Sequence, residues 1–143
     1  MAYQIAVAGA SGRRGQMLIQ AIDADPDCRL TGALDLADSA AMGQDAGAFL
    51  GRSTGVAITA DLKQGLQNSR FLIDFTRPEG TLQHLKACRE LGVAAVIGTT
   101  GFTDAQKAVI ADVARDVAVV CAPNMSVGVN VTLKLLQMAA TAM

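Results

Sequence analysis

The chain has 143 residues, a hydrophobic content of 51% and a formal net charge of −1, which fits a single domain large enough to bury a core. The near balance of acidic and basic residues excludes a global field for nucleic acid, and no apolar run approaches the roughly 20 residues that cross a bilayer. Cys28, Cys88 and Cys121 match neither a disulfide framework nor a zinc motif, so we expect a reducing, cytoplasmic setting without a metal.

Apolar periodicity predicts strands and helices in regular alternation. In chain order we expect a strand over 3–8, a helix over 13–24, a strand over 29–35, a loop over 36–55, a short strand over 56–58, a helix near 61–68, a strand over 70–74, a helix over 78–91, a strand over 93–98, a helix carrying Ala105, Val109 and Val113, a strand over 117–122 and a final helix from about Ser126. Helices that separate strands predict an α/β fold: a Rossmann-type, doubly wound, mainly parallel sheet with helices on both faces.

The same spacing predicts the buried faces of the helices. These faces carry Met17, Leu18, Ala21 and Ile22 in the first helix, Leu82, Leu85 and Cys88 in the helix over 78–91, and Ala105, Val109 and Val113 in the following helix. The final helix has Leu133, Leu136 and Met138 to bury and runs to the last residue without a stop signal. We therefore expect the chain to be cut within a longer protein.

A glycine-rich turn follows the first strand in the stretch VAGASGRRGQM, residues 7–17. Gly9 suits the tight turn, Gly12 lets the backbone approach a phosphate, and Gly15 lets the helix pack against the strand. The helix N-terminus then offers free amides and a partial positive charge to a pyrophosphate. The G-x-x-G-x-x-G spacing alone also fits an ordinary glycine-rich turn.

An acidic residue at the end of the second strand favours the dinucleotide interpretation. Asp35 lies 20 positions after Gly15, where a carboxylate accepts hydrogen bonds from the adenosine ribose. Leu36 follows it in place of an arginine, which favours a free 2′-hydroxyl and therefore NADH. Arg13 and Arg14 lie close enough to serve a pyrophosphate or a 2′-phosphate, so NADPH stays open.

Three further loops follow predicted strands, at the edge where open α/β sheets bind ligands. They read DFTRPEG (74–80), GTTGF (98–102) and APNMSVG (122–128). Small and hydrogen-bonding residues there suit a cofactor that approaches the backbone. Local capping is the alternative: Thr103 or Asp104 and Ser126 can each cap the helix that follows.

Four strings of the sequence, GASGRRG, DFTRPEGTLQH, VIGTTGF and APNMSVGVN, resemble the N-terminal domain of bacterial dihydrodipicolinate reductase in order and spacing. The resemblance implies reduction of a cyclic intermediate of the diaminopimelate route to lysine with hydride from NADH or NADPH. It places the cofactor contacts at Gly9, Ala10, Ser11, Gly12, Arg13, Arg14, Asp35, Gly98, Thr99, Thr100, Ala122, Pro123, Asn124 and Met125. Where the family has an acid followed by arginine, this chain has Asp35 followed by Leu36.

The resemblance also implies a missing part. In the family, the proton donor and the substrate clamp lie on a histidine-rich segment ending in lysine, in a domain that builds a homotetramer. We expect residues 1–125 to form the dinucleotide-binding domain and residues 126–143 to begin the helix leading toward that absent domain. His84 matches no catalytic position and is expected to be a surface or partly packed histidine, so the chain should bind cofactor without turning over its small-molecule substrate.

Two other functions stay open. A semialdehyde-type dehydrogenase can share the glycine spacing and would use Cys121, at the end of a strand, as its nucleophile, although no histidine is placed to activate it. A non-enzymatic NAD(H)-binding module would need only the glycine-rich loop. The sequence alone does not separate that module from a truncated reductase.

Overall fold

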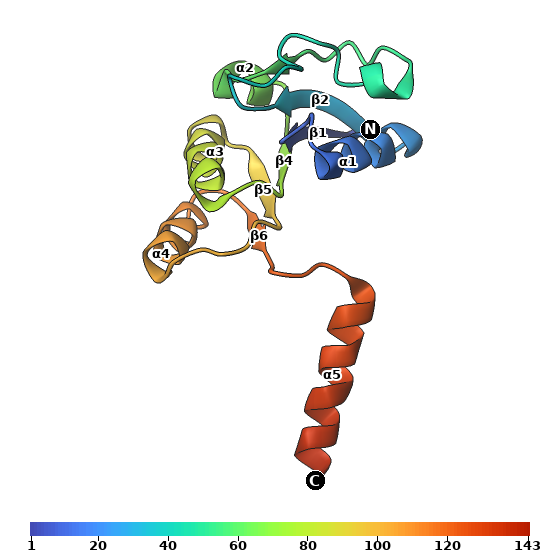
Figure 1. The fold of residues 1–143 in the computed structure, drawn as a ribbon. Helices are drawn as coiled ribbons and strands as arrows, with labels where there is room; N and C mark the ends of the chain where they lie inside the picture. Colours follow the sequence, from blue (N-terminus) through green and yellow to red (C-terminus); the bar gives the residue numbers. More distant parts are fainter.

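The computed structural model describes residues 1–143 and contains six strands and five α-helices (Figure 1). The strands are β1 (Tyr3–Ala8), β2 (Cys28–Leu34), β3 (Ile58–Thr59), β4 (Phe71–Asp74), β5 (Ala94–Ile97) and β6 (Val119–Cys121). The helices are α1 (Arg13–Ala24), α2 (Leu62–Leu66), α3 (Pro78–Leu91), α4 (Asp104–Val113) and α5 (Val127–Ala142), with a 3-10 turn, η1, at Ala48–Leu50. Every predicted element is present, and η1 interrupts the expected loop over 36–55.

The strands form one sheet in the order β3-β2-β1-β4-β5-β6, and every neighbouring pair is parallel. From β1 the chain winds outward to β3, returns to place β4 beside β1, and winds in the opposite direction to β6. The direction of winding reverses between β1 and β4, and ligands bind at such a switch point. The predicted doubly wound α/β fold is confirmed.

Helices cover both faces of the sheet, with α1 on one side and α2, α3 and α4 on the other (Figure 1). Side chains alternate along β1, so Ile5 and Val7 pack in a core with Ile19 of α1, whereas Ala6 and Ala8 pack with Leu66 of α2. A third cluster joins α3 and α4 to β5. Burial on both faces explains the Ala- and Val-rich strands.

Two predicted buried faces are wrong in part. Met17 and Ala21 are exposed, Met17 to 70%, because the side of α1 that faces the sheet carries Gly15, Ile19 and Ile22. The close approach of Gly15 fixes this rotation of the helix, and Met17, two residues further on, lies on another face. In α4, Ala105 and Val109 are exposed, and the buried pair is Ile110 and Val113.

The helix ends agree with the capping residues in the sequence. Thr103 forms a capping box with Gln106 at the start of α4, and the Ser126 side chain accepts a hydrogen bond from the Val129 amide at the start of α5. Pro78 occupies the first turn of α3, which ends at Gly92 in the left-handed conformation. The capping predictions at Thr103 and Ser126 are confirmed.

The loop between β2 and β3 is organised around Asp45. Its carboxylate accepts hydrogen bonds from the amides of Gly47, Thr54 and Gly55 and from the hydroxyls of Ser53 and Thr54, all within 2.7–2.9 Å. These bonds, that of the Thr54 amide foremost, hold the pKa of Asp45 well below its usual value.

Helix α5 leaves the sheet after β6 and extends away from the other helices (Figure 1). None of its residues is buried, and its valine, leucine and methionine side chains are largely exposed. No helix of the chain combines the length and apolar character needed to span a bilayer.

Candidate functional site

The glycine-rich turn has the geometry that its spacing predicts. Gly9 has a φ of +68°, which side chains disfavour, and a Cβ built on Gly15 would lie 2.0 Å from the Gly9 carbonyl oxygen. Helix α1 therefore packs directly on the turn. Gly12 precedes the helix and supplies no side-chain cap, which leaves amides of the first turn for an anion.

The carboxylate of Asp35 lies against this turn, as the 20-residue spacing predicts. Its Oδ2 accepts a hydrogen bond from the Ser11 amide at 2.8 Å, and its Oδ1 accepts one from the Leu36 amide at 2.8 Å. A carboxylate has about four acceptor positions, so both oxygens keep capacity for further donors. The Leu36 side chain is 72% exposed beside it.

A cavity of about 660 Å³ opens at the carboxyl ends of β4, β5 and β6, next to the first turn of α1. Seven of the predicted site residues line it: Arg14, Gly98, Thr99, Thr100, Pro123, Asn124 and Met125. Gly9 to Arg13 and Asp35 form the adjoining turn instead. Ala122 lies outside the cavity, and its amide continues the sheet by donating to the Ile97 carbonyl at 3.1 Å.

Six further residues, which are not among the predicted site residues, also line the cavity: Met17, Leu18, Ala21, Phe75, Thr76 and Ser126. Phe75 is the most consequential, because its ring occupies the place of a side chain at Gly98, 2.0 Å from a built Cβ. The Arg14 guanidinium carbon lies 5.1 Å from the centroid of the same ring, within range for a cation–π contact. Phe75 and Thr76 lie in the loop over 74–80 that the strand-end rule singles out, but no pattern in the sequence marks these two residues within the loop.

A buried carboxylate lies below this cavity. Asp74, the last residue of β4, has no exposed surface, and its Oδ2 lies 2.7 Å from Nδ1 of His84 on α3. Burial acts to raise the pKa of Asp74, but the hydrogen bond and charge of His84 and the hydrogen bonds of Thr76 outweigh it and lower the pKa below its usual value. His84 is a partly packed histidine, as expected, and its carboxylate partner was not predicted.

Cys121 is an unsuitable nucleophile. The residue is exposed at the end of β6. Partial desolvation raises the pKa of its thiol and no nearby charge lowers it, whereas an activated cysteine needs a lowered pKa. His84, which is the one histidine, is held by Asp74.

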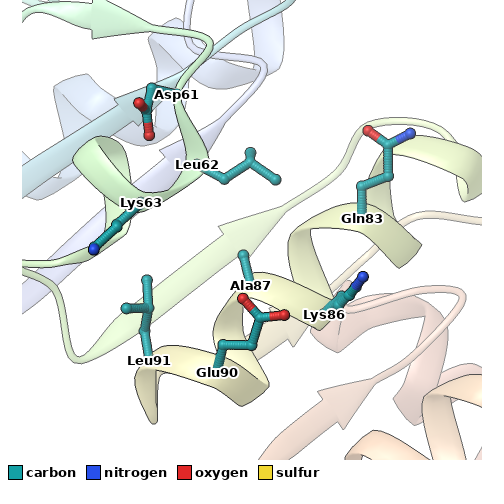
Figure 2. A pocket seen from close by; sticks show the side chains of 8 residues that line it. All are labelled: Asp61, Leu62, Lys63, Gln83, Lys86, Ala87, Glu90 and Leu91. Atoms are coloured by element: carbon teal, nitrogen blue, oxygen red, sulfur yellow. The ribbon is translucent and has the colours of Figure 1, made fainter.

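A second hollow, of about 610 Å³, lies between α2 and α3 (Figure 2). Figure 2 shows that both helices contribute charged side chains, among them Lys63, Lys86 and Glu90. None of the predicted site residues lines this hollow. We place the candidate site at the strand ends, because the glycine turn and the switch point of the sheet meet there.

The parallel sheet, its switch point and the glycine turn define a Rossmann-type α/β domain of the kind found in oxidoreductases. The family model described as "Dihydrodipicolinate reductase, N-terminus" matches residues 3–125. The chain belongs to this family, which confirms the resemblance drawn from the four sequence strings.

Individual relatives agree with this assignment. The chain is 62% identical to the 4-hydroxy-tetrahydrodipicolinate reductases of Herminiimonas arsenicoxydans and Janthinobacterium sp. (strain Marseille), over 96% of this chain and 51% of each relative. A solved structure, the dipicolinate-bound dihydrodipicolinate reductase from Paenisporosarcina sp. TG-14, is similar with a TM-score of 0.79 and 25% identity, over 98% of this chain and 54% of that chain. The chain spans about half the length of the curated relatives that it matches.

Proposed function

We propose that the chain is the NAD(P)H-binding part of a 4-hydroxy-tetrahydrodipicolinate reductase, which reduces a cyclic dihydrodipicolinate precursor to tetrahydrodipicolinate in lysine biosynthesis. One observation carries the proposal: Asp35, the glycine turn and the strand-end cavity follow one another along a single edge of the sheet. A ligand that uses all three must be long, with a hydroxyl-rich end, a charged middle and a flat polar end. A nicotinamide dinucleotide has this form.

The residues divide between the parts of such a ligand. Residues 9–14 hold the pyrophosphate at the N-terminus of α1, Asp35 accepts from the adenosine ribose, and residues 98–100 and 122–125 lie along the nicotinamide half. Gly12 precedes α1 without a side-chain cap, which supports a close approach of the backbone to phosphate. When bound, the nucleotide supplies the hydride, and the protein orients it.

NADH is the favoured cofactor. Asp35 beside the exposed Leu36 supports a free 2′-hydroxyl, since no arginine follows the acid to pair with a 2′-phosphate. Because the chain has no tryptophan, titration by nucleotide fluorescence measures both cofactors without interference. Tighter binding of NADPH than of NADH would contradict this assignment.

Binding at the predicted edge is tested by substitution of the acid. Asp35→Ala should raise the Kd for NADH by about tenfold, the loss expected for hydrogen bonds to a charged group. Asp38→Ala, a change at an exposed acid three residues further on, serves as the matched control and should leave the Kd unchanged. Equal affinity of Asp35→Ala and the unsubstituted chain would place the ribose elsewhere.

Residues 126–143 begin the connection to a substrate and tetramerisation domain, and we assign no catalytic residue to this chain. The unburied helix α5 and the half-length match to the relatives support this division. We expect the 143-residue chain to bind NADH in the cytoplasm but not to oxidise it with the cyclic substrate. Steady turnover of the cyclic substrate by this chain, without a second polypeptide, would refute the proposal that the chain binds the cofactor but does not catalyse the reaction.

A further inference from the structure

Five side chains form a polar cluster between α3 and the floor of the strand-end cavity. We call it the Asp74 cluster: Asp74, Thr76, Thr81, His84 and Thr99. Asp74, Thr81 and Thr99 are buried, and Thr76 and Thr99 also line the cavity. The cluster therefore lies between the candidate site and helix α3, and the proposed function gives a role only to Thr99 among its members.

The carboxylate determines the direction of the hydrogen bonds. Asp74 is an acceptor only, so Oδ1 accepts from the Thr76 amide at 2.8 Å, from the Thr76 hydroxyl at 2.6 Å and from the Thr99 hydroxyl at 3.4 Å. The Thr99 hydroxyl also lies 2.8 Å from the Thr81 hydroxyl, a hydrogen bond in which either can donate. The Thr99 hydroxyl is thereby committed to the protein, which leaves its backbone for a ligand.

On the other side, His84 must donate through Nδ1–H to Oδ2 of Asp74. His84 and Thr81 lie three residues apart on α3, so both project from one face of the helix. One helix face thus holds the loop after β4 through His84 and the loop after β5 through Thr81. These two loops meet at Asp74, and a longer contact of 3.5 Å between the Thr76 and Thr81 hydroxyls gives a second link through α3.

We propose that His84 is a positioning residue for the dinucleotide: through Asp74 it fixes the loops after β4 and β5 in the arrangement that the nicotinamide half requires. This inference rests on the proposed function. His84 is 15% exposed and Asp74 is fully enclosed, so loss of the Nδ1–H donor leaves a buried carboxylate short of a partner. Thr76 and Thr99 both donate to this carboxylate and both line the cavity, so a shift of Asp74 moves the cavity wall.

The test compares four variants of the 143-residue chain. His84→Leu removes the donor at similar size, whereas His84→Asn retains an N–H at the place of Nδ1. Gln83→Leu alters an exposed neighbour on α3, and Thr31→Val breaks a second hydroxyl pair, between Thr31 and Ser69 at 2.8 Å, which lies outside the site. Each variant is measured for its Kd for NADH and for its urea midpoint without ligand.

We expect His84→Leu to raise the Kd by about tenfold or more, and His84→Asn to recover most of that loss. Thr31→Val should lower the urea midpoint without changing the Kd, and Gln83→Leu should change neither. If His84→Leu does not fold, Thr81→Val, which removes the hydrogen bond between the Thr81 and Thr99 hydroxyls at a residue outside the cavity wall, must raise the Kd in its place.

An unchanged Kd in folded His84→Leu, or a Kd that follows the urea midpoint in all variants including Thr31→Val, would overturn the inference and leave the proposed function intact. Failure of the unsubstituted chain to bind either nucleotide would overturn both. Hydrogen exchange at the Thr76 amide gives an independent measure, because this amide donates to Asp74. Its exchange should accelerate in His84→Leu and not in Gln83→Leu.

Discussion

The substitution Gly15→Ala tests the packing of α1 on the glycine turn. The added methyl carbon would lie 2.0 Å from the Gly9 carbonyl oxygen and 2.9 Å from Cα of Ala10, where ordinary contacts begin at 3.4 Å. Both neighbours are backbone atoms and cannot rotate away, so the helix or the turn must move. Overpacking of this kind lowers the unfolding free energy by about 3 kcal/mol at its upper range, and the higher helix propensity of alanine raises it by about 1 kcal/mol.

The expected net loss is about 2 kcal/mol of unfolding free energy, or a fall of about 1 M in the urea midpoint followed by far-UV circular dichroism. NADH binding should be lost with it, because the same turn is the proposed pyrophosphate site. Gly80→Ala on α3 is the matched control: its Cβ would lie 3.4 Å from the nearest atom, the Thr76 hydroxyl oxygen, and alanine should stabilise by about 0.5 kcal/mol. If Gly15→Ala were as stable as Gly80→Ala and still bound NADH, the close packing of helix on turn would be refuted.

Three further predictions concern other parts of the chain. Asp45→Asn should lower the unfolding free energy at pH 7 by about 1 kcal/mol. Because folding lowers the pKa of Asp45, the stability that its carboxylate contributes is complete above its ordinary pKa of 3.8 and declines at lower pH. The difference in urea midpoint between variant and parent should therefore shrink at pH 3. Leu36→Arg should move the ratio of NADPH to NADH affinity about tenfold toward NADPH in fluorescence titrations, and an unchanged ratio would count against Asp35 as the ribose contact. The exposed apolar side of α5 should cause self-association in sedimentation experiments, which the double change Leu133→Lys and Leu136→Lys should reduce; a monodisperse parent chain at high concentration would contradict this.

Much of the fold follows from local signals in the sequence. The bounds of α3 agree with the prediction because Pro78 suits a first turn and Gly92 ends the helix in a left-handed conformation. The position of Asp35 also follows, since one strand, one helix and a second parallel strand have nearly fixed lengths in a Rossmann-type unit.

The features that were missed depend on packing between elements. Met17 has the spacing of a buried residue, but the contact of Gly15 with the turn rotates it to the surface. The pairing of Asp74 with His84 requires the end of a strand and one face of the next helix to meet, and apolar periodicity carries no information on polar partners. Phe75 lies over Gly98 because two loops after neighbouring strands converge, which the order of residues does not reveal.

Residues 123–126 combine two properties described above: they contribute to the wall of the cavity, and they belong to the segment that connects β6 to α5. Hydrogen bonds tie this segment to the helix: the Asn124 side-chain oxygen accepts from the Ser126 amide at 2.8 Å, and Nδ2 of Asn130 in α5 donates to the Asn124 carbonyl oxygen at 3.0 Å. The backbone at Asn124 therefore sets the direction in which the 16-residue helix leaves the sheet, and the same residue lines the cavity.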